Sequence, residues 1–425
     1  MYNDTMQVIS SLSEAEALLK RYAPANLTRP AYTLDHIQRC MEFLGNPQNR
    51  LRVIHVAGTS GKTSTSYYIA ALLQQTGKKV GLSVSPHIES LNERVQINLT
   101  PLAEKDFCSE LAIFFDLVQQ SDIVLSRFEC LAAFMYWEFA RQKVDYAVVE
   151  VGLGGTLDAT NLVENRHKAC IITDIGYDHQ EVLGNSLAEI AGNKAGIIGL
   201  HNQVFCYDQG AEVTSVIQHR ARQKQADLRF VDQELPEKFA FLPLFQQRNF
   251  NLSVAVVGQL LERDSLPQLN DGAILQAAQV HIPARMEQFT VGGKTIILDG
   301  AHNAQKLQAL HDSLLVQYPD QSVAVLVAFK AKQANRIEQA TEVLSKLGNH
   351  IIVTTYGTPS AIEPYGEDPA IIAALCKIHG SLSVETIANP AHAFRQLLSR
   401  PESVLLITGS FYLFNDIRPL LKPAK

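Results

Sequence analysis

Short apolar runs alternate with longer amphipathic stretches along most of this chain. In the first half, the apolar runs predict buried strands at Val53–Ala57, Val80–Val84, Tyr146–Val149, Ala169–Thr173 and Val204–Tyr207. Strands that are apolar throughout are typical of parallel sheets, because helices cover both faces of such sheets. The alternation therefore predicts α/β layers throughout.

A second series of apolar runs begins near residue 295. It predicts strands at Thr295–Leu298, Val323–Val327, Ile351–Thr354 and Val404–Ile407, and helices at Gln305–Leu315 and Ile337–Leu347. The two series are separated by a helical stretch, Leu252–Arg263, and then by a segment that contains Pro, Asp and Gly, as domain linkers often do. We therefore predict a parallel-sheet domain over residues 1–283 and a smaller, Rossmann-like α/β domain over residues 284–425.

Composition narrows the classes of function. The chain has 425 residues, of which 46% are hydrophobic, so it can bury a large core. Its net charge is −6 and it has no dense Lys/Arg run, which argues against a nucleic-acid partner. Residues 1–22 lack the apolar core of a signal peptide, and no uncharged apolar run is long enough to span a bilayer. The 6 scattered cysteines favour buried thiols in a reducing cytoplasm over disulfides or a zinc site.

The sequence HVAGTSGKTST, at residues 55–65, joins a predicted strand to a helical pattern through a glycine-containing turn. The N–H groups of such a turn, the positive end of the helix and the ammonium of Lys62 converge on one point, which suits a triphosphate. The match to the full P-loop pattern is partial, because Val56 stands where its first glycine would be. The strand and helix on either side favour nucleotide binding over an ordinary turn.

Another predicted strand ends in Glu150 and is followed by the glycine-rich turn 152–155. Ligands of open α/β sheets lie at this edge, where a carboxylate can bind Mg²⁺ that is held against nucleotide phosphates. The alternative is that Glu150 is merely solvated at the strand end. The upstream phosphate loop favours the metal.

Polar residues also follow the strand at 169–173, and His179 among them could ligate a metal, although a lone histidine is more often structural. Next, Ser186-x-x-Glu189 forms a capping box, and Lys194 falls on the apolar stripe of the helix that it predicts. A buried ammonium is unfavourable unless it is paired or loses its proton, and a neutral amine can react with CO₂. The alternative is a lysine whose stem packs while its head reaches water.

In the C-terminal half, an acid and a histidine, Asp299 and His302, follow a predicted strand. A turn rich in Gly and Asn needs no function to explain it. Arg285 lies in the predicted linker, and a guanidinium there can contact a phosphate and respond to domain closure.

Together these segments resemble the folylpolyglutamate synthase and dihydrofolate synthase family, a branch of the ATP-dependent Mur-type amide ligases. The resemblance covers nearly the whole chain, in the order LGNP, HVAGTSGKTST, SPHIESLNER, FE, EVGLGGTLDATN, DIGYDH, NKAGI, PARME, LDGAHN and ITGSFY. So many ordered matches are far more specific than any single motif. They imply an N-terminal P-loop-type ATPase domain and a C-terminal α/β ligase domain.

The resemblance also implies a role for each matching residue. The nucleotide would be held by Gly58, Thr59, Ser60, Gly61, Lys62, Thr63, Asn251, Arg285 and Asp299. One Mg²⁺ would be bound by Ser85 and Glu150, and a second by His179 and Lys194, a lysine that is commonly carbamylated in this family. Catalysis would involve Lys62, Lys194 and His302, and the pterin-bearing substrate would contact Phe128 and Glu129.

The chain departs from the family pattern at several positions. Ser60 and Thr63 stand where asparagine and glycine are usual, and both keep polar groups suited to phosphate or Mg²⁺. Larger departures are Thr156 for arginine, Asn193 for glutamate, Ala132 for threonine, and Phe329-Lys-Ala-Lys332 in place of Asp-Lys-Asp. These positions bear on the substrate more than on the nucleotide.

We therefore expect a cytoplasmic, monomeric ligase that uses ATP and Mg²⁺ to add L-glutamate to a carboxylate of dihydropteroate or a reduced folate through an acyl phosphate. We expect no nucleic-acid or membrane partner. The main alternative is a related Mur-type ligase that acts on a cell-wall precursor. A P-loop ATPase or switch without ligase activity, and an inactive scaffold, account for fewer of the residues. The sequence leaves open whether dihydropteroate, folate or both are substrates.

Overall fold

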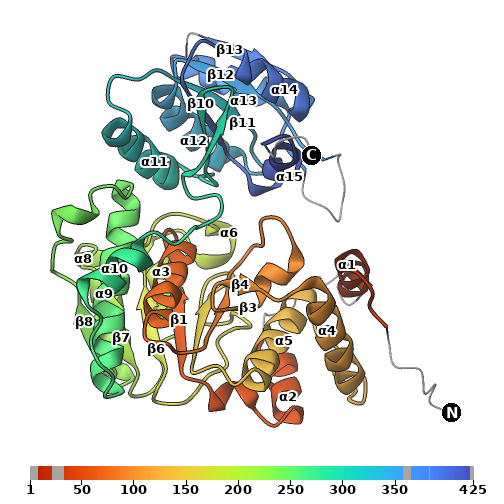
Figure 1. Ribbon diagram of the computed structural model, residues 1–425, viewed down its shortest axis with the longest axis vertical. Helices are drawn as coiled ribbons and strands as arrows, with labels where there is room; N and C mark the ends of the chain where they lie inside the picture. Colours follow the sequence, from red (N-terminus) through yellow and green to blue (C-terminus); the bar gives the residue numbers. More distant parts are fainter. Residues whose placement is uncertain (1–7, 22–32, 358–364, 382, 422–425) are drawn as a thin grey trace. The chain divides into compact units, whose positions relative to one another are not determined.

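The computed structural model describes residues 8–21, 33–357, 365–381 and 383–421, so part of the N-terminal segment considered for a signal peptide lies outside the described residues. The chain forms two compact units. Unit 1 comprises Met1–Leu235 and Arg248–Val280, and unit 2 comprises Pro236–Gln247 and His281–Lys425. Each unit has a β-sheet covered by helices, which confirms the predicted α/β class (Figure 1). The predicted domains, 1–283 and 284–425, stay a prediction.

Unit 1 is built on an eight-stranded sheet in the order β4-β3-β2-β5-β1-β6-β7-β8. Its strands are β1 (Val53–Ala57), β2 (Val80–Ser83), β3 (Gln96–Ile97), β4 (Thr100–Pro101), β5 (Tyr146–Glu150), β6 (Ala169–Ile172), β7 (Gln203–Cys206) and β8 (Asp227–Phe230). All pairs are parallel except β2 with β3 and β3 with β4, which are antiparallel. Strand β8 was not predicted because its residues alternate between exposed and half-buried, as expected at a sheet edge.

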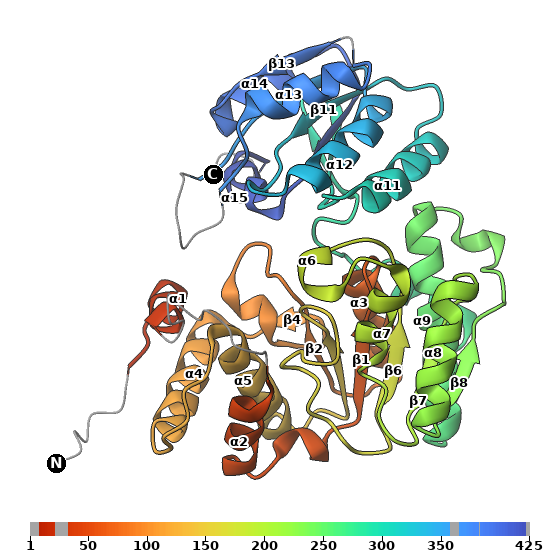
Figure 2. The same cartoon turned by 180° about the vertical axis from the view of Figure 1, so that it is seen from behind.

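The register of the strands assigns the helices of unit 1 to two layers. Val53 pairs with Ala147, and both belong to a core shared with α1 (Leu12–Arg21), α2 (Asp35–Phe43), α4 (Glu104–Val118) and α5 (Arg127–Arg141). On the same face, Cys170 and Ile172 pack against α7 (Leu187–Ala195) and α8 (Ala211–Gln223), which lie side by side (Figure 2). The other face carries α3 (Lys62–Gln74), which packs against α9 (Leu244–Arg263) and α10 (Asp271–Ala278).

Unit 2 contains a six-stranded sheet in the order β13-β12-β11-β14-β10-β9. Its strands are β9 (Glu287–Val291), β10 (Lys294–Leu298), β11 (Val323–Val327), β12 (His350–Val353), β13 (Val384–Thr386) and β14 (Val404–Thr408). Only β9 among these runs antiparallel to its neighbour. The helices are α11 (Ala304–Gln317), α12 (Ala334–Leu347), α13 (Pro369–Ile378), α14 (Pro390–Leu398) and α15 (Phe411–Leu421). The first three share one core with the sheet, and the last two pack against each other.

Strand order also indicates where ligands would bind in unit 1. The chain passes from β1 to β2 and β5 on one side, and then to β6, β7 and β8 on the other side. Ligands of such sheets bind beyond the carboxyl ends of the strands, where the order reverses. The segments after β1, β5 and β6 therefore form the expected binding edge.

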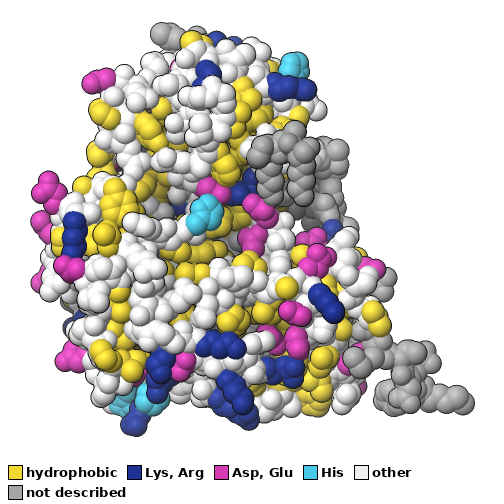
Figure 3. All heavy atoms as spheres, viewed as in Figure 1, with side chains coloured by type: hydrophobic (Ala, Val, Ile, Leu, Met, Phe, Trp, Pro, Cys, Tyr) yellow, Lys and Arg dark blue, Asp and Glu magenta, His cyan; other side chains and the backbone are white. Residues whose placement is uncertain are grey.

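Two expectations from composition can be compared with the described part of the chain. All 6 cysteines are buried and free, and burial raises the pKa of Cys40 to about 11 and that of Cys206 to about 12. No helix among the described residues is long and apolar enough to cross a membrane. On the face drawn in Figure 3, Lys and Arg side chains of unit 1 are interspersed with Asp and Glu.

Candidate functional site

The turn between β1 and α3 has the strand–turn–helix form that the sequence predicts. Strand β1 is buried along its whole length and ends at Ala57, and α3 begins at Lys62. The N–H groups of Thr59 and Ser60 donate to the carbonyl oxygen of Asp174, at 2.8 and 3.1 Å. The first N–H groups of a helix have no partner within the helix, so the start of α3 can bind an anion.

Two glycines of this phosphate loop, residues 58–63, are required by their surroundings. Gly58 and Gly61 have φ values of +155° and +86°, which side chains rarely adopt. A Cβ on Gly58 would lie 1.8 Å from Oγ1 of Thr173, and a Cβ on Gly61 would lie 2.4 Å from Oδ1 of Asn249. The loop is therefore packed closely between the segment after β6 and helix α9.

Two lysines converge on the phosphate loop. The Nζ atoms of Lys62 and Lys194 donate to the same carbonyl oxygen, that of Gly58, at 3.0 and 2.8 Å. Lys194 is only 4% exposed, and its helix α7 begins with the predicted capping box of Ser186 and Glu189. Two ammonium groups this close repel each other, and a bound anion would reduce the repulsion. The arrangement suits phosphate.

Glu150 lies beside the loop at the end of β5, where it is 4% exposed. Its Oε1 accepts from Oγ1 of Thr63 at 3.0 Å, and its Oε2 accepts from the N–H of Ser85 at 3.1 Å. The structure thus brings together three residues expected near one Mg²⁺. Carboxylate and hydroxyl oxygens retain lone pairs after these bonds and are ligands that Mg²⁺ prefers.

His179 lies at the N-terminus of α6 (Gln180–Leu183), with a φ of +50°. Its Nδ1 is 3.5 Å from Oε1 of Glu181, and its Nε2 is 3.9 Å from Oδ1 of Asp178. Among the described residues, no group of three or more His, Cys, Asp or Glu side chains could hold a metal. A second cation at His179 and Lys194 therefore stays a prediction, and any Mg²⁺ here would also need hydroxyl, phosphate or water oxygens.

The two residues expected at the pterin both lie in the first turn of α5. The ring of Phe128 covers Gly152, since a Cβ there would lie 2.3 Å from the ring. The carboxylate of Glu129 accepts from the N–H of Ser126 at 2.7 Å and thereby caps the helix, a bond that the sequence analysis did not anticipate. The expected adenine residue, Asn251, donates from Nδ2 to the carbonyl oxygen of Gln233.

Two departures from the family pattern prove to be partners. The N–H and the hydroxyl of Thr156 both donate to the carbonyl oxygen of Asn193, each at 2.9 Å. A Cβ on Gly155 would lie 2.8 Å from the carbonyl oxygens of Asn193 and Lys194. The glycine-rich turn thus packs against the end of α7, and this contact fixes the backbone that carries Lys194.

In unit 2 the structure brings together Arg285, Asp299 and His302. The guanidinium of Arg285 lies 4.9 Å from the ring centroid of Phe411, and the His302 ring meets the same ring edge-on at 6.0 Å. Oδ2 of Asp299 accepts from the N–H of Met286 at 2.9 Å. Burial raises the pKa of the Asp299 carboxyl, and the charge of Arg285 acts in the opposite direction. Phe411 was not singled out by the sequence analysis.

Hydrogen bonds define the tautomer of His302. Its Nδ1 is 2.7 Å from the carbonyl oxygen of Gly300, which can only accept, so Nδ1 carries the proton. Its Nε2 is 3.1 Å from Nζ of Lys306, whose ammonium can only donate. The ring is therefore neutral in this arrangement, with Nε2 as the acceptor.

Comparisons with known proteins agree with these features. The Mur ligase, glutamate ligase domain matches residues 284–411. The dihydrofolate synthase/folylpolyglutamate synthase of Mycobacterium tuberculosis is 31% identical, over 84% of this chain and 81% of its own length. The protein of the same name from Bacillus subtilis is 28% identical, over 92% of this chain and 95% of its own length.

A solved structure shows the same fold. The folylpolyglutamate synthase of Mycobacterium tuberculosis, complexed with ADP and AMPPCP, superposes with a TM-score of 0.83 and 26% identity. The match covers 97% of this chain and 98% of that one. With the phosphate loop, the Glu150 contacts and the unit 2 cluster in place, this chain belongs to the folylpolyglutamate synthase and dihydrofolate synthase family of Mur-type ligases.

Proposed function

We propose that this protein is an ATP-dependent ligase that joins the amino group of L-glutamate to a carboxylate of dihydropteroate or a reduced folate. The observation that carries the proposal is the convergence of Lys62 and Lys194 on the phosphate loop, beside Glu150. Membership of the family supports the choice of substrates.

The reaction begins with a carboxylate, which does not react with amines at neutral pH. A carboxylate oxygen of the pteridine substrate attacks the γ-phosphorus of ATP, so that ADP leaves and an acyl phosphate forms. The neutral amine of glutamate then attacks the acyl carbon, inorganic phosphate leaves, and the ammonium proton is released. The start of α3 and the ammonium of Lys62 stabilise the charge on the transferring phosphoryl group.

A magnesium ion fits the oxygens around Glu150. Glu150, the hydroxyl of Thr63 and Ser85 would hold it, because these groups lie together and retain free lone pairs. When bound, Mg²⁺ neutralises charge on nucleotide phosphates. We further propose that Asn251 faces adenine, that Arg285 and Asp299 complete the nucleotide site, that His302 acts near the reacting phosphate, and that Phe128 and Glu129 contact the pterin.

A substrate panel tests the proposed activity. Phosphate release in the presence of ATP, Mg²⁺ and L-glutamate should depend on an added pteridine, either dihydropteroate or tetrahydrofolate, and each product should gain one glutamate by mass. A cell-wall nucleotide precursor serves as the competing substrate. Release that required this precursor, or that needed no acceptor at all, would contradict the proposal.

Lys194 is a further point of test, because we propose that its amine adds to CO₂ to form a carbamate. The new N–C bond and the loss of two protons would turn a buried cation into an anion. That change would remove its repulsion from Lys62. Crystals grown with bicarbonate should show density beyond Nζ, and ¹³C-bicarbonate should give a carbamate NMR signal that is absent in Lys194→Ala. An unmodified ammonium in fully active protein kept free of bicarbonate would refute the modification.

A further inference from the structure

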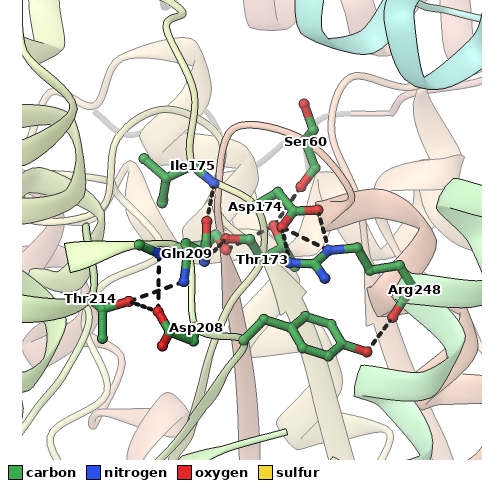
Figure 4. Close-up of polar contacts among 11 residues, drawn as sticks. Ser60, Thr173, Asp174, Ile175, Asp208, Gln209, Thr214 and Arg248 are labelled. Carbon is green, nitrogen blue, oxygen red and sulfur yellow. Dashed lines mark hydrogen bonds and ion pairs between the residues drawn. The ribbon is translucent and has the colours of Figure 1, made fainter. Parts of the chain in front are cut away.

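The segment after β6 holds the phosphate loop from one side (Figure 4). The carbonyl oxygen of Asp174 accepts from the N–H groups of Thr59 and Ser60. Its carboxylate accepts from Arg248 on α9: Nε lies 3.0 Å from both oxygens, and Nη2 lies 2.8 Å from Oδ1. Asp174 therefore connects the loop to α9 through its backbone and its side chain.

The side chain of Gln209 fixes the peptide groups on both sides of Asp174. Its Oε1 accepts from the N–H of Ile175 at 2.7 Å, and its Nε2 donates to the carbonyl oxygen of Thr173 at 3.2 Å. Strand β6 ends at Ile172, so these peptide groups lie beyond the ladder that β6 forms with β7. The amide of Gln209 takes the place of a neighbouring strand. Its own N–H donates to Oγ1 of Thr214 at 3.0 Å.

Arg248 is itself held in place. Its guanidinium lies 4.0 Å from the centroid of the Tyr207 ring, and the hydroxyl of Tyr207 donates to the carbonyl oxygen of Arg248 at 2.9 Å. The next residue, Asn249, closely contacts Gly61 on the other side of the loop. Helix α9 thus sets the position of the phosphate loop from two directions.

We propose that Gln209 and Arg248 are positioning residues for the phosphate loop. By holding Asp174, they keep Thr59 and Ser60 engaged, and so they aim the start of α3 at the phosphates before the nucleotide arrives. Without them the loop would have to be ordered by the nucleotide, which weakens binding. This inference rests on the proposed binding of ATP at residues 58–63.

Three variants test the inference, with ADP binding followed by calorimetry. Gln209→Met removes both amide bonds without adding charge, and Arg248→Met removes the pair with Asp174. Each should raise the Kd for ADP by about tenfold, because losing bonds of this kind weakens an interaction by roughly that factor. Arg248→Lys keeps the charge but loses the two-pronged geometry, so it should weaken binding nearly as much as Arg248→Met.

Matched controls come from the opposite ends of the same elements. Gln203 begins β7, and its Oε1 accepts from Nη1 of Arg263, near the end of α9, at 3.2 Å. Arg263 also pairs with Asp264 at 2.8 Å, as Arg248 pairs with Asp174. Gln203→Met and Arg263→Met should lower the melting temperature by amounts similar to the test variants, while the Kd for ADP stays within about twofold of the wild-type value.

Kinetics supply the second readout. In the ligase assay, the test variants should raise the KM for ATP while the KM for glutamate stays unchanged. An unchanged Kd for ADP in Gln209→Met and Arg248→Met, equal losses in the controls, or full recovery in Arg248→Lys would each overturn the inference. Wild-type protein that binds ADP but ligates no substrate would instead contradict the proposed function, and the ADP data would still decide the role of these residues.

Discussion

Lys62→Ala should reduce the rate of glutamate ligation by about 10³-fold or more, with little change in melting temperature. The Nζ of Lys62 lies 3.0 Å from the carbonyl oxygen of Gly58, and the residue opens α3 rather than filling a core. Its charge would be needed most in the transition state, when the phosphoryl group carries its charge between two oxygens. Turnover is measured by phosphate release at saturating ATP, together with thermal unfolding.

Lys78→Ala provides the control for this variant. Lys78 pairs with Asp145 at 3.5 Å before β2, so its removal also deletes one lysine, but away from the phosphate loop. Its rate should stay close to that of the wild type. If Lys62→Ala kept half or more of the wild-type rate, the assignment of residues 58–63 to the ATP phosphates would be wrong.

Glu150→Ala should raise the Mg²⁺ concentration needed for half-maximal activity by roughly tenfold or more, and kcat/KM at physiological Mg²⁺ should fall accordingly. The variant removes the only carboxylate in the group formed with Thr63 and Ser85. His179→Ala should shift the same titration, because we assign His179 to the second cation. Both titrations are followed by ligase activity at fixed ATP.

Asp145→Ala is the matched control for Glu150, because Asp145 precedes the opposite end of the same strand. Its Oδ2 accepts from the N–H of Lys79 at 2.9 Å, far along β5 from the loop. The Mg²⁺ titration of this variant should overlay that of the wild type. Curves for Glu150→Ala and His179→Ala that also overlay it would leave both residues with structural roles only.

Much of the fold could be predicted from the chain because its central strands are buried on both faces. A strand such as Val323–Val327 is apolar at every position and was predicted with its exact bounds. Strands at the edges, such as β8 and β13, carry mixed side chains and left no such signal. Likewise, the capping box at Ser186 and the apolar stripe through Lys194 are local patterns, and the structure contains both.

The sequence by itself determined which segments carry chemistry: the phosphate loop, the acid that ends β5 and the helix of Lys194. Local order is enough for these, because a strand, a turn and a helix are written in neighbouring residues. Only the tertiary structure decided what surrounds them. Asp174 meets Arg248 across 74 positions of sequence, and the grouping of Pro236–Gln247 with unit 2 is equally non-local. Such contacts depend on how strands are ordered in a sheet, and periodicity within a single segment carries no record of that order.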